Sequence, residues 1–140
     1  MDFSMAGPAI VLGISSMGSC VGCYIAGAAS HAIMSRVEEG HGKFIGLSAA
    51  PSSQSIYGFI LMILMRNAIR AGTLSPFNGV VMGIFIGMAF LFSSVFQGKV
   101  CATGIQATAK QPAIFGKCFA AVGIIESFAL FAFVFSILIM

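Results

Sequence analysis

The sequence predicts an all-α membrane protein with four transmembrane helices, arranged as two tandem hairpins of the same orientation. Three observations support this fold class: four long apolar stretches, a shortage of charge, and an internal repeat at an offset of 74 residues. Of the 140 residues, 59% are hydrophobic and only 8% are charged, and the mean hydropathy is +1.03. Soluble domains carry roughly 25% charged residues, so lipid is the expected solvent for most of this chain. The basic residues form no patch, and we expect no nucleic-acid partner.

Four apolar stretches define the expected helices, because each exceeds the ~20 residues that cross a bilayer core. They cover residues 6–35, 44–71, 77–109 and 113–140. The polar breaks between them, at residues 36–43, 72–76 and 110–112, are short, so consecutive helices are expected to form antiparallel hairpins. The start of the chain, Met1–Ser4, has no basic region, and we expect no removable signal peptide.

Basic residues near the helix ends set the expected orientation. Those on the side of the first and third breaks are Arg36, Lys43, Lys99, Lys110 and Lys117, against Arg66 and Arg70 near the second break. The positive-inside rule therefore predicts that the breaks at 36–43 and 110–112 are cytoplasmic and that both termini lie outside.

The repeat predicts a duplicated hairpin. At an offset of 74 residues the matching pairs include Gly13 with Gly87, Ser19 with Ser93, Ala28 with Ala102, Ser53 with Ser127, and Phe59 with Phe133. Each half holds two spans, so residues 1–71 and 72–140 are expected to share one orientation and form one structural unit. In this register Glu126 falls opposite Ser52, which predicts one ion for every four helices.

Small residues distinguish the odd-numbered helices. Gly18 and Gly22 form one Gly-x-x-x-Gly pair, and residues 79, 83 and 87 form a double one. This spacing lets helix backbones approach closely in lipid, so we expect the first and third helices to pack as a crowded inner layer, with the second and fourth outside.

The four cysteines lie in or beside apolar helices and are expected to be small, buried packing residues. They are Cys20, Cys23, Cys101 and Cys118.

Glu126 is the most informative residue, because it is an acid near the middle of the last apolar stretch. A charge at membrane depth costs several kcal/mol and indicates a functional site. Counted from the cytoplasmic helix ends, Gln54 and Gln97 fall at the same depth, roughly 15–20 Å in. Ser53 and Tyr57 are near this layer, so a carboxyl, two amides and two hydroxyls are expected to meet.

This collection of side chains suits a hard cation. Glu126 would supply charge, Gln54 and Gln97 their amide oxygens, and Ser53 its hydroxyl oxygen. Pro51 removes a helical hydrogen bond, so the carbonyl of the Ala50 turn can join the shell. The same group also suits a proton, because desolvation favours the neutral acid and Gln or Tyr can hydrogen-bond to it.

Four motifs carry a resemblance to a known family: Pro51–Phe59, Phe96–Val100, Gly104–Gln106 and Ile125–Ser127. The chain resembles, over essentially its whole length, the proteolipid or membrane rotor-ring subunits of V-type ATPases in the duplicated four-helix form. It is similar above all to bacterial sodium-translocating members. Ser53 and Ser52 stand where the sodium motif usually has Thr and a preceding Gly, and Ala50 stands where it usually has Leu.

The resemblance implies a homo-oligomeric ring in a bacterial cell membrane. Ions would load through half-channels of a stator subunit, and a central stalk would link the ring to an ATP-hydrolysing head. Glu126 would carry sodium or a proton, with Gln54, Gln97, Ser53 and the Ala50 carbonyl as sodium ligands. Tyr57 would hydrogen-bond to Glu126. The chain itself has no nucleotide loop and no nucleophile with a base, so no catalytic residue is predicted and any ATP hydrolysis belongs to partner subunits.

Two other interpretations remain open. A small four-helix cation or drug–proton antiporter also uses a membrane Glu, although such proteins usually place it in the first helix and line the site with Trp and Tyr. This chain has no Trp. A structural scaffold would pair Glu126 with Lys99, whose amine otherwise extends to the cytoplasmic interface.

Overall fold

The computed structural model describes residues 3–140, so the expectation for the start of the chain falls partly on Met1 and Asp2, outside the described residues. The elements in chain order are α1 (Ala6–Met34), α2 (His41–Ala49), the 3₁₀ turn η1 (Ala50–Ser52), α3 (Ser53–Ala71), α4 (Pro76–Lys110), the 3₁₀ turn η2 (Pro112–Ile114) and α5 (Phe115–Leu138). Four helical stretches are long and apolar enough to cross a membrane, at residues 6–34, 41–71, 76–110 and 112–138. The four predicted spans are confirmed.

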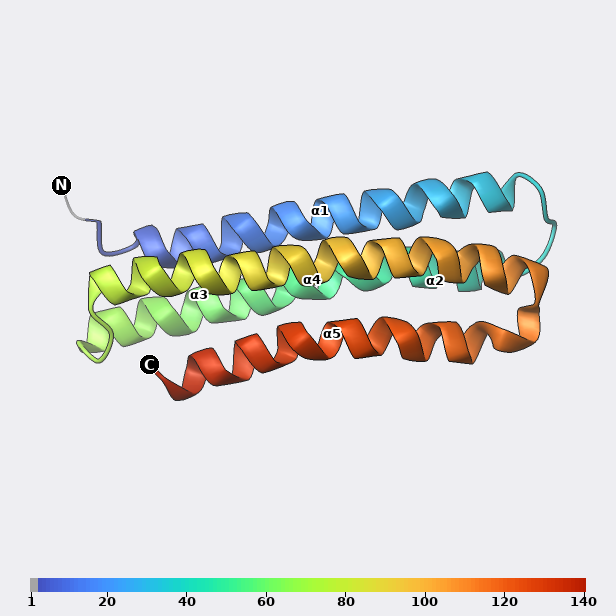
Figure 1. Cartoon of the computed structure of the whole chain (residues 1–140). Helices are drawn as coiled ribbons and strands as arrows, with labels where there is room; N and C mark the ends of the chain where they lie inside the picture. Colours follow the sequence, from blue (N-terminus) through green and yellow to red (C-terminus); the bar gives the residue numbers. More distant parts are fainter. Residues whose placement is uncertain (1–2) are drawn as a thin grey trace.

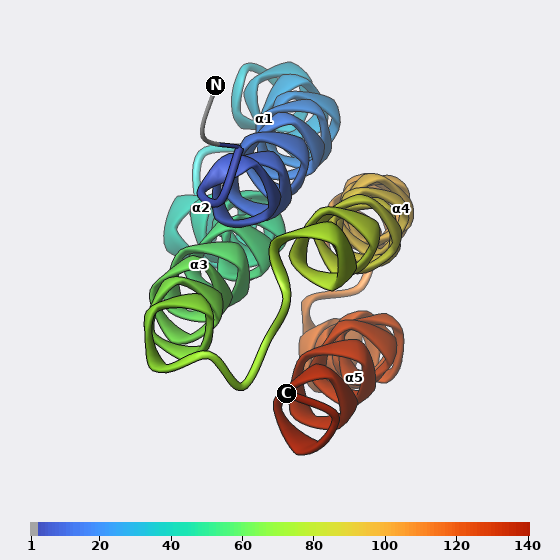
Figure 2. The same cartoon turned by 90° about the vertical axis from the view of Figure 1, so that its left-hand side faces the viewer.

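The chain runs as two consecutive hairpins of long helices, with the start of α1 and the end of α5 at the same end of the bundle (Figure 1). The first hairpin is α1 followed by α2, η1 and α3, and the second is α4 followed by η2 and α5. Seen end-on, α1 lies beside α4, and α3 and α5 lie on one side of that pair (Figure 2). The chain therefore forms two layers of helices, as the glycine pattern predicted.

The first break is shorter than the predicted range of 36–43, because α2 begins at His41 rather than at Phe44. Gly40 makes this possible: its φ of 82° is the left-handed conformation that glycine adopts without a steric penalty. The chain turns at this residue and enters the helix at once. His41, Gly42 and Lys43 are thus helical, which corrects the predicted boundary.

Local hydrogen bonds cap the two helix ends at the second connection, the end of α3 and the start of α4. Gly72, with φ of 78°, ends α3, and the Thr73 N–H then bonds to the Ala68 carbonyl at 3.0 Å. This is the usual way in which glycine satisfies the last carbonyls of a helix. Ser75 caps α4 by accepting the Asn78 N–H at 3.2 Å, and Pro76 occupies the first helical position.

Glycines bring α1 and α4 into backbone contact. A Cβ built at Gly7 would strike the Gly79 backbone, and one built at Gly22 would strike the Ser94 carbonyl and the Pro51 side chain. At Gly98 it would strike the Gly22 backbone in turn. Substitution at any of these positions would therefore force the two helices apart.

Two apolar clusters fill the bundle. One comprises Val11, Leu61, Met65, Leu74, Phe90 and Ala129, and the other comprises Ala26, Phe44, Leu47, Cys101, Ile105 and Val122. Along each of the second, third and fourth spans, the polar positions Gln54, Gln97 and Glu126 fall between members of the two clusters. The polar layer is thus enclosed by packed side chains on both sides.

The cysteines are less uniform than predicted. Cys101 is buried in the second cluster, but Cys23 and Cys118 are only half-buried and Cys20 is exposed. The prediction of four buried cysteines is wrong for Cys20. The physical reason is that an apolar thiol on a membrane helix needs no protein contact, because surrounding lipid is itself apolar.

Candidate ion site

The side chains predicted to meet at one depth form a connected network. The Tyr57 hydroxyl donates to Oε1 of Glu126 at 2.6 Å, and Nε2 of Gln97 reaches Oε2 of the same carboxyl at 3.5 Å. Nε2 of Gln54 donates to Oε1 of Gln97 at 3.0 Å. Three spans therefore converge on one carboxyl. Both amides are fully buried, whereas Glu126 and Tyr57 are half-buried.

Ser53 and Ala50 lie at the edge of this network. The Ser53 hydroxyl donates to the Ala50 carbonyl at 3.1 Å and lies 3.3 Å from Oε1 of Gln54. The three groups thus place a carbonyl, a hydroxyl and an amide oxygen close together. Neutral oxygens of these kinds are the ligands that hard cations accept.

Pro51 interrupts the second span at this point, as predicted. Lacking an N–H, it cannot continue the α-helical hydrogen bonds, and the chain tightens into the 3₁₀ turn η1 before α3 resumes at Ser53. In the turn, the Ala50 N–H bonds to the Leu47 carbonyl, and the Ser53 N–H bonds to the Ala50 carbonyl. The carbonyl of Ala50 and the hydroxyl of Ser53 thus lie at the two ends of this short turn, within hydrogen-bond distance of each other.

Two serines, one on α1 and one on α4, form hydrogen bonds with main-chain groups at this break. The Ser94 hydroxyl donates to the Pro51 carbonyl at 2.7 Å, and the Ser55 N–H donates to the Ser19 hydroxyl at 3.0 Å. The broken main chain is thereby satisfied by α4 on one side and by α1 on the other.

Aromatic rings fix the tyrosine. The Tyr57 ring stacks on Phe133, with centroids 5.8 Å apart and an interplanar angle of 30°, and it meets Phe90 at 6.3 Å and 57°. Contacts of this geometry stabilise a ring beyond its burial alone. The hydroxyl is held at the Glu126 carboxyl by a ring that is packed between α4 and α5.

The family model for the ATP synthase C-subunit matches the chain twice, over residues 6–65 and 80–139. The chain belongs to the ATP synthase C-subunit family. The two matched stretches begin and end 74 residues apart, the offset found in the sequence, so the duplication is confirmed. In this family of ATPase membrane proteins, ATP is hydrolysed by partner subunits, and the chain itself is not catalytic.

Two relatives are similar over nearly the whole chain. The V-type sodium ATPase subunit K of Enterococcus hirae is 35% identical over 145 aligned residues, which cover 99% of this chain and 90% of the relative. The A-type ATP synthase subunit K of Methanocaldococcus jannaschii is 30% identical over 134 residues, covering 96% of this chain. The chain spans 60% of the length of that second relative.

The ammonium group of Lys99 does not contact the Glu126 carboxyl. Its ammonium sits over the Phe96 ring, 5.4 Å from the centroid, and its side chain is exposed. Among residues 3–140, no ion pair joins Lys99 to Glu126. The scaffold interpretation, which required that pair, loses its supporting contact.

Three serines at the site were not predicted as its members: Ser19, Ser93 and Ser94. All three are buried. Counting depth along each helix does not tell which side of the helix a residue faces. Depth alone therefore could not show that these three hydroxyls face the site. The repeat did contain a signal, because Ser19 and Ser93 are a matching pair.

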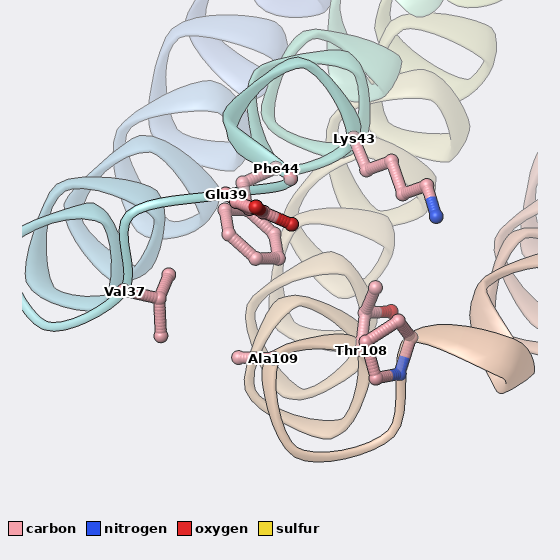
Figure 3. A pocket seen from close by; sticks show the side chains of 8 residues that line it. Val37, Glu39, Lys43, Phe44, Thr108 and Ala109 are labelled. Atoms are coloured by element: carbon pink, nitrogen blue, oxygen red, sulfur yellow. The ribbon is translucent and has the colours of Figure 1, made fainter.

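A separate cavity of about 340 Å³ opens at the end of the bundle that holds the first connection (Figure 3). Glu39 and Lys43 line it from the loop and the start of α2, and Thr108 and Ala109 line it from α4. None of the predicted ion-site residues lines this cavity. It is distinct from the Glu126 site.

Proposed function

We propose that this chain is the ion-carrying rotor-ring subunit of a V-type rotary ATPase, with sodium as the favoured ion. The observation that carries the proposal is the Glu126 carboxyl, held by Tyr57 at 2.6 Å beside the Gln97 amide in the middle of the bundle. An acid at such a depth is expensive unless it is neutralised in use. Family membership and the sodium ATPase relative support the same assignment.

Sodium would be bound by Glu126, Gln54, Gln97, Ser53 and the Ala50 carbonyl. Gln54 offers Oε1, which lies 3.3 Å from the Ser53 hydroxyl, so these two oxygens are already neighbours. Oε1 of Gln97 accepts from Gln54, but an amide oxygen has a second lone pair that can face a cation. A proton would need the carboxyl alone, so the extra oxygens favour sodium.

Neutralisation of the carboxyl would control movement. An unpaired carboxylate facing lipid is costly, so a copy can leave the stator and pass through lipid only after a cation or proton has neutralised it. Rotation driven by ATP hydrolysis in partner subunits would then carry bound ions around the ring. Tyr57 would hold the charged side chain in place between loading and release.

The repeat predicts how many ions one chain would carry. Of the proposed hairpins at residues 1–71 and 72–140, the first has Ser52 at the position of Glu126 and Cys23 at the position of Gln97. It therefore lacks both the acid and one amide. One chain would carry one ion for four helices, with the α1 and α4 layer facing the ring interior.

The proposed orientation follows the basic residues. The connections around 36–43 and 110–112 would face the cytoplasm and the central stalk, and both termini would lie outside a bacterial cell membrane. The stator would contact the outer layer, because Glu126 lies on α5 and is half-buried in the isolated chain.

Transport by the assembled complex tests this function. Vesicles containing the complex should take up ²²Na⁺ when ATP is added, and a protonophore should leave that uptake intact or increase it. A complex with Glu126→Gln should assemble a ring of unchanged copy number and take up no sodium. Uptake abolished by the protonophore would indicate a proton pump instead, and a dimeric chain would indicate the antiporter.

A further inference from the structure

Ser93 contacts the candidate ion site without belonging to its predicted ligand set. Its hydroxyl donates to the Ile125 carbonyl at 3.2 Å and accepts from Nε2 of Gln54 at 3.3 Å. The residue is 7% exposed and lies on α4, one helical turn before Gln97. It therefore bridges the helix that carries Gln54 and the helix that carries Glu126.

The orientation of the Gln54 amide decides whether this residue can bind a cation, because only its oxygen is a ligand. Nε2 has two hydrogens, and both have acceptors on α4: Oγ of Ser93 at 3.3 Å and Oε1 of Gln97 at 3.0 Å. Oε1 of Gln54 is then left on the side of the Ser53 hydroxyl, 3.3 Å away. Reversing the amide would turn an N–H toward the cation.

The direction of each hydrogen bond at Ser93 follows from its partners. The Ile125 carbonyl can only accept, so the Ser93 hydroxyl must donate its single proton there. The Ser93 oxygen is consequently an acceptor toward Gln54, and it selects the amide nitrogen over the amide oxygen. Oε1 of Gln97 also accepts from Nε2 of Gln54, but this depends on the orientation of the Gln97 amide. That orientation is held by the bond from Nε2 of Gln97 to the Val122 carbonyl, at 3.4 Å.

The first hairpin offers a useful comparison. Its matching serine, Ser19, accepts a main-chain N–H from Ser55 rather than a side-chain amide. In that hairpin Cys23 stands where α4 has Gln97, and Ser52 stands where α5 has Glu126. Of this matching pair of serines, the one in the half that keeps the acid thus contacts an amide side chain, and the other contacts the main chain.

We propose that Ser93 is a positioning residue for sodium, which keeps the Gln54 amide oxygen turned toward the cation and so sets the sodium affinity of the site. This inference rests on the proposed sodium function. A serine that merely joined helices would affect every state of the site alike. A positioning residue affects sodium binding but not protonation, because a protonated Glu126 needs no oxygen from Gln54.

Carbodiimide labelling separates these roles, because the reagent attacks the protonated carboxyl of Glu126 and bound sodium protects it. The complex would be labelled at fixed pH over a sodium titration, in the wild type, Ser93→Ala, Ser93→Thr and Ser15→Ala. Ser15 is a matched control: it is buried on the inner layer, and its hydroxyl donates to Leu12 of its own helix at 3.0 Å.

Loss of one such hydrogen bond should raise the half-protecting sodium concentration of Ser93→Ala about fivefold. Its labelling rate without sodium should stay at the wild-type value. Ser93→Thr keeps the hydroxyl and should restore most of the affinity, and Ser15→Ala should match the wild type.

Protection of Ser93→Ala at the wild-type sodium concentration would overturn the proposal. So would a Ser93→Ala labelling rate that changed equally with and without sodium. Failure of the underlying function looks different, because the wild-type complex would then show no protection by sodium at all.

Discussion

The Tyr57 hydroxyl donates a 2.6 Å hydrogen bond to Oε1 of Glu126, across 69 residues of sequence and between the two hairpins. The acid is in the second hairpin and its partner is in the first. The two halves of the duplicated chain therefore complete one site together, although only one of them carries an acid. Under the proposed function, the binding of one ion would need residues from both hairpins.

Removing that hydroxyl should loosen the carboxyl. In Tyr57→Phe, Glu126 loses its shortest hydrogen bond, and a bond to a charged group contributes about 1.5–3 kcal/mol. We expect the half-protecting sodium concentration in the labelling assay to rise at least tenfold. Tyr24→Phe is the matched control, because Tyr24 is the other tyrosine and is 74% exposed. Equal behaviour of the two variants would contradict a role for the Tyr57 hydroxyl.

Phe133 should act through Tyr57. Because its ring stacks on Tyr57, Phe133→Leu should weaken sodium protection, but less than Tyr57→Phe does. In a double-mutant cycle, Phe133→Leu should add little once the hydroxyl has been removed. Phe135→Leu, at a ring that is 61% exposed and contacts Phe131, serves as the control. Additive effects in the cycle would show that Phe133 does not act through the hydroxyl.

The serine at the helix break should stabilise the fold. Ser94→Ala leaves the Pro51 carbonyl without its 2.7 Å donor in a buried place, which costs about 1–3 kcal/mol. Thermal dissociation of the purified protein should therefore occur at a lower temperature. Ser30→Ala is a close comparison, because the Ser30 hydroxyl is buried and has no hydrogen-bond partner within residues 3–140. Ser30→Ala should leave the dissociation temperature unchanged or raise it. Equal destabilisation by Ser94→Ala and Ser30→Ala would show that the bond to Pro51 is not what Ser94 contributes.

The α1 and α4 contact should not tolerate a side chain at Gly22. A methyl group there meets the Ser94 carbonyl and the Pro51 side chain, whereas one at Gly27 meets nothing within 4 Å. Gly22→Ala should reduce the yield of assembled protein sharply, and Gly27→Ala should not. Yields measured by size-exclusion chromatography after membrane extraction compare the two. A normal yield for Gly22→Ala would mean that the helices are not held at backbone contact.

Most of the architecture could be predicted because one physical constraint dominates it. Each apolar stretch has to be a helix in lipid, so the four spans and their hairpins followed from the sequence alone. That Gln54, Gln97 and Glu126 lie at one level of the bundle, joined by hydrogen bonds, followed as well, because the rise per residue of a helix is fixed. The start of α2 did not, since Gly40 turns the chain more tightly than composition indicates.

The directions of side chains were harder to predict than their depths. Ser94 reaches Pro51 and Ser93 reaches Gln54 because of how α4 is rotated against the second span, and no single-helix pattern gives that rotation. The same uncertainty explains the exposed Cys20. Positions along a helix follow from sequence, whereas contacts between helices follow from packing.

Protection of Glu126 from carbodiimide by sodium is the decisive measurement for a sodium site at this carboxyl. The assembled protein would be labelled at one pH and one ionic strength, in sodium or in potassium, with Glu126→Gln as the unlabelled control. We expect slow labelling in sodium and fast labelling in potassium, with more sodium needed at lower pH because protons compete for the same carboxyl. Equal rates in the two salts, set by pH alone, would rule out the sodium site and make Glu126 a proton carrier.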